Sequence, residues 1–402
     1  MEIAKRLVKK LGGWQYTIIC LLLVTNLVIH FAIINDPPLL VLDEQHYIGD
    51  ARNILQEHTT DRTEHPPLGK LIITSGVALF GDNPFGWRTF SILFGTANIF
   101  LLFLICRRLG MSPKGANLAA FLLTFENLSF VQGSIAMLDV FSLTFTLLAF
   151  WLYLRGNYPL SGFAVALATL AKLSGAFALI VIGLHWLITR RKGLLYFAAS
   201  MMLAPLGFFI LMPPLQFAIY HHLTNFVVDI QVMLARSASL TFSSTTHPSL
   251  VRPWTLLILP KVMPYYYNPH YFGAISFTLW ALTIPTFIYM IVKAVKKNVA
   301  GLFGAIWFFG TYLIWIPISL ITDRVSYPYY FYPAVGAICI GLGMGLSGMI
   351  DFWRTKKTGK LRWLAISAVV LFLLLHFAVF VILAPVNPWP VENFIFSTPI
   401  TH

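Results

Sequence analysis

Long apolar runs recur along almost the whole chain and restrict its fold more than any other feature. A helix needs about 20 apolar residues to cross the roughly 30 Å apolar core of a bilayer. Eleven runs approach this length: about 14–35, 87–106, 115–132, 137–154, 159–171, 174–189, 194–213, 272–292, 300–321, 328–349 and 363–384. Only 11% of the 402 residues are charged, against about 25% in a typical soluble protein. The sequence therefore predicts an all-α polytopic membrane protein with about 11 transmembrane helices.

The segments between these runs are too short for a separate soluble domain of typical size, so residues 1–402 are expected to form a single membrane-embedded domain. The three cysteines lie within apolar runs, which argues against a disulfide framework. The net charge of +13 would suggest a nucleic-acid partner in a soluble chain. In a membrane chain it is first a topology signal, and no nucleic acid is expected as a partner.

The positive charges predict a topology. With the N-terminus in the cytoplasm, 19 of the 28 basic residues fall on that side, at positions 5–10, 107–114, 155, 190–192, 293–297 and 354–362. Thirteen of the 15 acidic residues then fall on or near the other face. Two long outer segments result, at about 36–86 and 215–271. An amphipathic stretch in the first, Leu42 to Leu55, is expected to form a helix along the membrane interface.

Ionisable residues gather at the predicted outer ends of the spans. Ionisable groups near a membrane usually mark function, and a transporter would place them near the midplane. A polytopic transporter is therefore a remote alternative. The residues concerned are Glu126, Asp139, Lys172, Arg88 and Arg324 in or beside spans, and Asp43, Glu44, Glu64, His65 and Lys70 in the first outer segment.

Several of these residues also have a purely structural interpretation. Asp43 and Glu44 could cap and begin a helix, and Lys70, Arg88 and Lys172 could anchor helices at the headgroups. Taken together, they supply carboxylates able to deprotonate a hydroxyl and cations able to stabilise a phosphate leaving group. Nucleotide sugars are not readily available outside the cell, so a sugar-transfer enzyme there is expected to use a sugar carried on a lipid phosphate. Membrane-exposed grooves would hold the lipid tail.

Several motifs resemble one family, the protein O-mannosyltransferases of the C-type glycosyltransferase superfamily, which also includes the aminoarabinose transferases. Asp43-Glu44 resembles the family's first-loop Asp-Glu motif, and residues 65–70 read as its His-Pro-Pro-Leu-Gly-Lys element. Arg88, Met137-Leu138-Asp139, the segment from Lys172 to Gly175, and the segment from Arg324 to Pro333 resemble later elements. The resemblance covers most of the chain and implies a C-type fold with interfacial helices in the first outer loop.

The resemblance also implies roles. Asp43, with Glu44, would be catalytic, and Asp43 would be the general base toward an acceptor hydroxyl, with inversion at the anomeric carbon. Arg88 would lead the contacts to the donor phosphate, joined by Lys70, His65 and Arg324. Asp139, Glu64, Lys172 and His247 would belong to the sugar or acceptor site. The expected reaction moves mannose from a polyprenyl-phosphate carrier to Ser or Thr of exported protein; a lipid or surface glycan is the alternative acceptor.

One departure from the family concerns the second outer segment. The roughly 57 residues of the second outer segment are too few for the β-trefoil insertion of the eukaryotic enzymes. A prokaryotic member in the plasma membrane is therefore expected, with its active site on the outer face. No cofactor is expected, although Asp43, His46, Glu64, His65 and His247 are residue types that could bind a divalent metal.

Overall fold

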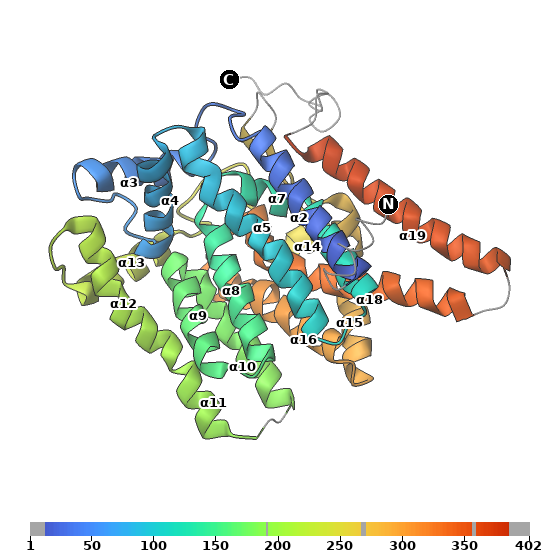
Figure 1. Ribbon diagram of the computed structural model, residues 1–402. Coiled ribbons are helices and arrows are strands. Elements are labelled where there is room, and N and C mark those ends of the chain that lie inside the picture. Colours follow the sequence, from blue (N-terminus) through green and yellow to red (C-terminus); the bar gives the residue numbers. More distant parts are fainter. Residues whose placement is uncertain (1–12, 190–191, 267–270, 356–358, 386–402) are drawn as a thin grey trace.

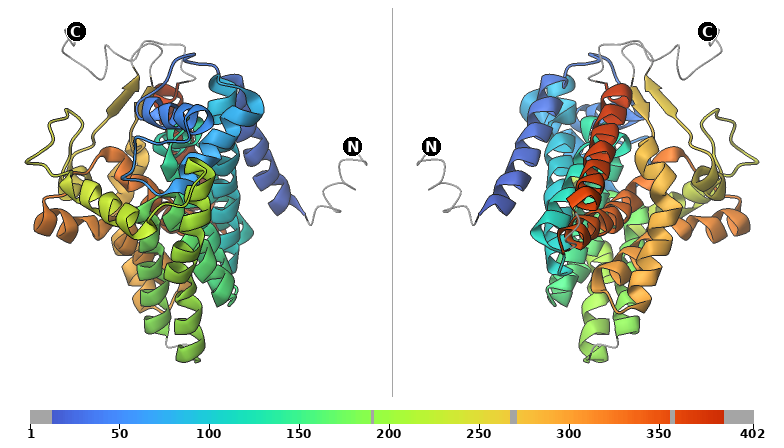
Figure 2. Two further views of the ribbon diagram at one scale, coloured as in Figure 1. Left: turned by 90° about the vertical axis from the view of Figure 1, so that its left-hand side faces the viewer. Right: turned by 90° about the vertical axis from the view of Figure 1, so that its right-hand side faces the viewer.

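The structure is a computed structural model that describes residues 13–189, 192–266, 271–355 and 359–385, most of them helical (Figures 1 and 2). The predicted cytoplasmic N-terminus and the basic residues at 5–10, 190–191 and 356–357 lie outside these ranges. The elements, in order, are α2 (Trp14–Ala32), α3 (Glu44–Gln56), α4 (Pro67–Phe80), α5 (Pro84–Arg108), α6 (Pro113–Thr124), α7 (Asn127–Ser134), α8 (Leu138–Leu154), α9 (Tyr158–Ala171), η1 (Leu173–Ala176), α10 (Phe177–Thr189), α11 (Leu194–Met201), α12 (Leu203–Tyr220), α13 (Phe226–Ser239), α14 (Pro253–Ile258), β1 (Met263–Tyr266), β2 (Tyr271–Gly273), α15 (Phe277–Val295), α16 (Val299–Phe308), η2 (Phe309–Leu313), α17 (Trp315–Thr322), η3 (Pro328–Phe331), α18 (Tyr332–Thr355) and α19 (Gly359–Leu383).

The helices are those of an integral membrane protein. Among the described residues, six helices are long and apolar enough to cross a bilayer, and the bent pair α7 and α8 could add a seventh. Four shorter apolar helices of 10–17 residues are also present: residues 16–32 of α2, the whole of α4, the whole of α9, and η1 together with α10. The predicted division of residues 159–189 into two helices is confirmed, because η1 separates α9 from α10. The total of eleven spans stays a prediction.

Three predicted boundaries were wrong. The run 115–132 is broken, because α6 ends at Thr124 and α7 begins at Asn127, where the Glu126 carboxylate caps α7 by accepting from the Ser129 amide at 2.6 Å. The helix predicted to stop at 213 continues to Tyr220 through Pro213 and Pro214, which apolar membrane helices tolerate. The run predicted from 272 begins as strand: β2 pairs with β1 in a small antiparallel sheet, and α15 starts at Phe277.

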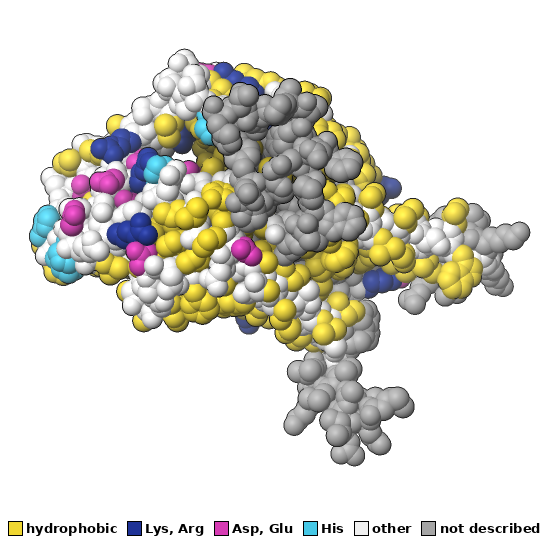
Figure 3. Space-filling view, turned by 90° about the horizontal axis from the view of Figure 1, so that it is seen from above, with side chains coloured by type: hydrophobic (Ala, Val, Ile, Leu, Met, Phe, Trp, Pro, Cys, Tyr) yellow, Lys and Arg dark blue, Asp and Glu magenta, His cyan; other side chains and the backbone are white. Residues whose placement is uncertain are grey.

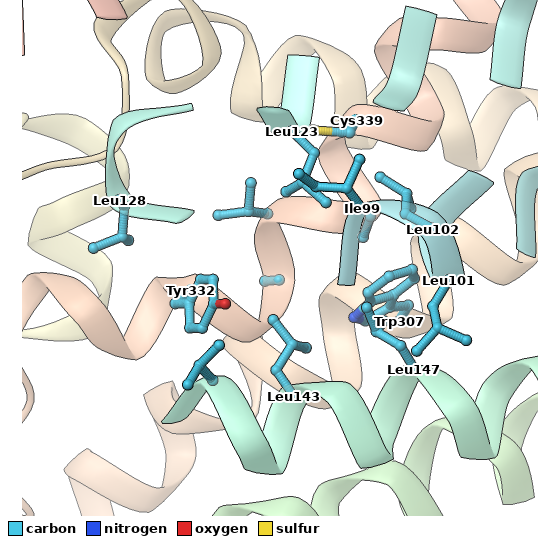
Figure 4. Close-up of a cluster of buried hydrophobic side chains, with 14 of the residues drawn as sticks. Ile99, Leu101, Leu102, Leu123, Leu128, Leu143, Leu147, Trp307, Tyr332 and Cys339 are labelled. Carbon is cyan, nitrogen blue, oxygen red and sulfur yellow. The ribbon is translucent and has the colours of Figure 1, made fainter. Parts of the chain in front are cut away.

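The core lies where α5, α6, α8, α16 and α18 pack together, and its large apolar side chains are shown in Figure 4. Trp307 is fully buried there and donates from Nε1 to the Pro333 carbonyl at 2.8 Å. Helices α6 and α18 approach closely because Gly343 has no side chain: a Cβ there would lie 2.6 Å from the Gly115 carbonyl oxygen. Small residues at such crossings let membrane helices pack by contact of their backbones. The result is a rigid frame behind the site.

The first long interhelical segment folds against one end of this frame, called here the α3 end. The helix predicted in this segment is confirmed as α3, which lies across the direction of α8 and α9 in Figure 1; its place at the membrane interface stays a prediction. Its buried face includes Ile48, Ala51 and Ile54, whereas Leu55 is exposed. Viewed from this end, charged and histidine side chains gather on one part of the surface (Figure 3).

Candidate active site

A cavity of about 370 Å³ opens near the α3 end between α8, α10, α13 and α17. Five of the ten predicted site residues line it, and they come from three distant parts of the chain: Glu64, His65, Asp139, Lys172 and Arg324. The rest of the wall is largely apolar and includes Leu143, Phe177, Trp315 and Ile318. Along α8 the lining runs from Asp139 to Thr146, about 10 Å at 1.5 Å per residue. This space, the main cavity, therefore joins a charged end to an apolar one.

The charged end is organised by Lys172, which lies at the break between α9 and η1. Its ammonium group donates to both carboxylate oxygens of Asp139 at 2.8 Å and lies 5.4 Å from the centre of the Tyr329 ring. The Lys172 and Asp139 side chains are 16% and 7% exposed, so the pair remains open to whatever enters the cavity. Arg324 adds a second cation; it donates to the Ser237 carbonyl of α13 and is partly exposed.

His65 lies in the field of these cations. Burial, together with the positive charges of Lys172, Lys70 and Arg324, holds the pKa of His65 well below its usual range. The imidazole is therefore neutral near pH 7 and can donate or accept a hydrogen bond without adding charge. A neutral ring beside these cations suits an anionic ligand, because Arg324 donates to a backbone carbonyl and adds a positive charge to the Lys172–Asp139 pair.

Asp43 occupies the N-cap position of α3, but its carboxylate does not cap the helix. Burial raises its pKa above the ordinary aspartate value, against the nearby positive charges of Lys172 and Arg62. A carboxylate without a capping bond and with a raised pKa is suited to accept a proton. The residue before it, Leu42, has a φ of 48°, a conformation that costs a non-glycine residue about 1 kcal/mol or more and persists only where surrounding contacts enforce it.

Those contacts come from a fully buried pair, Glu44 and Arg88. Arg88 donates to both Glu44 oxygens at 2.8–3.0 Å and to the backbone carbonyls of residues 34, 37 and 39 at 2.8–2.9 Å. Glu44 also accepts from the amides of Val41 and Ala136 at 2.9 and 2.8 Å. All five guanidinium N–H groups and the carboxylate are thus satisfied. The pair fastens the segment before Asp43 to α5 and to the start of α8.

This geometry bears on four predicted roles, which stay predictions. Arg88 is 0% exposed and its five guanidinium N–H groups have acceptors in the protein, while the Glu44 carboxylate accepts four hydrogen bonds, so in this structure both hold the backbone in place. Lys70 does not line the main cavity, and with His65 it lines a second cavity of about 50 Å³. His247 is exposed on the segment between α13 and α14, where its ring contacts Tyr327.

Sequence reasoning missed Arg62, which donates to His46 Nδ1 at 2.6 Å and to Glu64 at 3.4 Å. The only available signal was a basic residue in a mainly acidic outer segment. As for a metal, no three His, Cys, Asp or Glu side chains in the described part of the chain are grouped so that they could hold an ion.

Comparison with known proteins tests the family resemblance that the sequence motifs predicted. Residues 64–217 match the sequence model of the family described as dolichyl-phosphate-mannose-protein mannosyltransferase. The polyprenol-phosphate-mannose–protein mannosyltransferase of Mycobacterium tuberculosis is 34% identical over 148 residues, which make up 35% of this chain. The resemblance to the protein O-mannosyltransferases is confirmed. The matched region spans only 28% of the mycobacterial protein.

Solved structures extend the likeness to the whole fold. The S. cerevisiae protein O-mannosyltransferase Pmt1-Pmt2 complex, bound to the sugar donor, is similar with a TM-score of 0.71 at 12% identity, over 93% of this chain and 90% of that one. ArnT from Cupriavidus metallidurans in the apo state is similar with a TM-score of 0.58 at 17% identity, over 93% and 77%. The chain therefore has the C-type glycosyltransferase fold.

Proposed function

We propose that this chain is a glycosyltransferase that moves mannose from a polyprenyl-phosphate carrier to Ser or Thr hydroxyls of exported protein. The observation that carries the proposal is the main cavity, whose charged end holds Lys172, Arg324 and neutral His65 while its other end is apolar. Such a space fits a ligand with an anionic head and a hydrocarbon tail. The mannosyl donor of the mycobacterial relative, as its name gives it, is a molecule of that kind.

In the proposed reaction the acceptor oxygen attacks the anomeric carbon as the bond from that carbon to the phosphate oxygen breaks. The acceptor proton passes to the Asp43 carboxylate, and the prenyl phosphate leaves with the bonding electron pair. Arg324 and Lys172 would stabilise the negative charge that develops on the phosphate. Attack from the face opposite the phosphate inverts the configuration at the anomeric carbon.

Charge distribution supports an orientation with the cavity outside the cell. Arg107, Arg108 and Arg155 lie at the ends of α5 and α8 that point away from α3, and Arg108 donates to the Leu154 carbonyl at 2.9 Å. Positive residues favour the cytoplasmic side of a membrane. We therefore propose a prokaryotic plasma-membrane enzyme whose N-terminus is cytoplasmic and whose active site faces outward.

The test is transfer by the purified protein in lipid, with polyprenyl-phosphate mannose and a Ser/Thr-rich peptide. We expect prenyl phosphate release and a matching mass gain on the peptide. The nearly isosteric Asp43→Asn variant should lose at least about 100-fold in rate, the usual contribution of a general base, while unfolding at the wild-type temperature. Asp82→Asn is the matched control, because Asp82 is an aspartate of the same segment, paired with Arg52 outside the cavity.

The outcomes separate the alternatives. Donor consumption without peptide gain would point to a lipid or glycan acceptor, the alternative that the likeness to ArnT keeps open. A donor that stays intact under all conditions would refute the mannosyl donor. Wild-type rates in Asp43→Asn would remove Asp43 from the mechanism.

A further inference from the structure

The irregular segment between α3 and α4 is held by a second buried ion pair, Asp50 and Lys70, whose side chains are 1% and 2% exposed and 3.7 Å apart. Asp50 Oδ1 accepts from the backbone amides of Asp61 and Arg62 at 2.9 and 3.3 Å. Lys70 Nζ donates to Thr60 Oγ1 at 2.7 Å and to the Arg62 carbonyl at 3.0 Å. The pair therefore binds both backbone groups of Arg62: Asp50 of α3 accepts from its amide, and Lys70 of α4 donates to its carbonyl.

The side chain held in this way bridges two other groups. Arg62 Nη2 donates to His46 Nδ1 at 2.6 Å and Nη1 donates to Glu64 Oε1 at 3.4 Å. An arginine always carries its protons, so Nδ1 of His46 must be the acceptor. The remaining proton of a neutral His46 then lies on Nε2.

Both bridged groups belong to the surroundings of the reacting centre. Glu64 lines the main cavity, and His46 is in the first turn of α3, directly after Asp43 and Glu44. The ionisable groups that act on Asp43 are Lys172, His46, Asp139 and Arg62. Lys172 and Asp139 neutralise each other largely, because they form a bidentate pair. Arg62 is thus a further cation that acts on Asp43, and its own carboxylate partner is Glu64 at 3.4 Å.

We propose that Arg62 is a positioning residue for the transfer reaction: held by Asp50 and Lys70, it fixes the tautomer of His46, orients Glu64 at the cavity wall and keeps a positive charge beside Asp43. This inference rests on the proposed function. It gives Lys70 a different part from the predicted phosphate contact, since its ammonium group is occupied by the segment it holds.

The experiment is the pH dependence of transfer by Arg62→Gln and Arg62→Lys in lipid. The positive charge of Arg62 opposes the rise in the pKa of Asp43 that burial causes, so its removal should raise that pKa further. Because the base must be ionised, the acidic limb of kcat/KM should move to higher pH by about half a unit or more in Arg62→Gln. Arg62→Lys should return the limb to its wild-type position but not the full rate, because lysine lacks the planar fork that bridges two partners.

Two further variants sharpen the test. Asp50→Asn should shift the limb in the same direction, and it should add less than its full effect in combination with Arg62→Gln, because both act through one arrangement. Arg52→Gln removes an arginine from the same segment whose partner is Asp82, and its limb should coincide with that of the wild type.

The opposing outcomes are distinct. A limb in Arg62→Gln that coincides with the wild type, or an Arg62→Lys variant no better than Arg62→Gln, would overturn the inference while the proposed function stands. Absence of mannosyl transfer by the wild-type protein would overturn the proposed function itself.

Discussion

Two ion pairs near the α3 end are alike in their chemistry but differ in their roles. Glu44 and Arg88 meet at 2.8 Å with side chains 0–1% exposed, and every donor of Arg88 has an acceptor in the protein. Asp139 and Lys172 also meet at 2.8 Å, yet both face the main cavity. The difference lies in the remaining contacts: three backbone carbonyls complete the first pair, whereas the second borders open space. Whether the hydrogen-bonding groups of an ion pair are all occupied within the protein, more than its charge or its burial, separates a structural pair from one available to a ligand.

The comparison also explains why the structural pair is placed there. Arg88 collects carbonyls from residues 34, 37 and 39, which follow α2 and precede Asp43. Backbone carbonyls with no regular secondary structure near a membrane are costly unless they are hydrogen-bonded. One guanidinium satisfies three of them, and Glu44 neutralises its charge. The irregular segment that carries Asp43 is therefore made rigid by this pair.

The largest effect on stability is expected for Arg88→Met. If Arg88 bound a ligand instead of stabilising the fold, the two ion pairs would not differ in the way described. Removing Arg88 leaves the buried Glu44 carboxylate without its cation and three carbonyls without donors, so the free energy of unfolding should fall by about 3–5 kcal/mol. Thermal unfolding in detergent or lipid measures this loss. A variant that unfolds like the wild type but has a raised KM for the donor would restore the predicted phosphate contact.

A smaller effect on stability is expected for Lys172→Gln. The Asp139 carboxylate left behind faces the cavity and can be hydrated, so the loss should be about 1–2 kcal/mol, typical of a partly exposed charged hydrogen bond. Transfer should fall about tenfold or more, because the variant lacks a cation at the charged end. Unfolding temperature and kcat/KM should be measured together. If Lys172→Gln lost as much stability as Arg88→Met and kept its rate, the distinction between the two pairs would fail.

The smallest effect on the free energy of unfolding is expected for Arg52→Gln, which serves as a reference for the two larger losses. Arg52 and Asp82 are paired at 2.8 Å with side chains 40% and 44% exposed, and exposed pairs contribute about 0–1 kcal/mol. The same unfolding measurement should therefore differ little from the wild type. A loss above about 2 kcal/mol would mean that exposure is a poor guide to the strength of ion pairs in this segment.

Sequence reasoning predicted much of the architecture, because helix formation in a membrane depends on local hydrophobicity. The apolar runs correspond to helices, and the period of the segment after Asp43 predicted α3. The failures occurred at Glu126, Pro213 and Tyr271, where tertiary contacts or tolerance of proline decided the boundary. A single side chain, such as the Glu126 carboxylate that binds the Ser129 and Ser276 amides, ends a helix that hydrophobicity alone would continue.

Within the candidate site, the sequence identified the residue types but not which of their hydrogen-bonding groups are already occupied within the protein. Asp139, Lys172, Glu64, His65 and Arg324 do come together, although they lie up to 260 positions apart. Arg88 and Lys70 have the same charge as Lys172, and no local pattern shows that their donors are already occupied. Arg62 was missed because its importance depends on His46, 16 residues earlier, and on the two helices that hold its backbone.

The sequence by itself determined that this is a membrane protein, at which end of the helices the ionisable residues gather, and which motifs it shares with the protein O-mannosyltransferases. These properties follow from composition, from charge between apolar runs and from short contiguous motifs, all of which are local. Only the tertiary structure decided which charges are saturated and which face the cavity. The physical reason is that a hydrogen bond satisfies a donor only at a specific distance and angle, and such geometry between residues far apart in the chain exists only once the helices are packed.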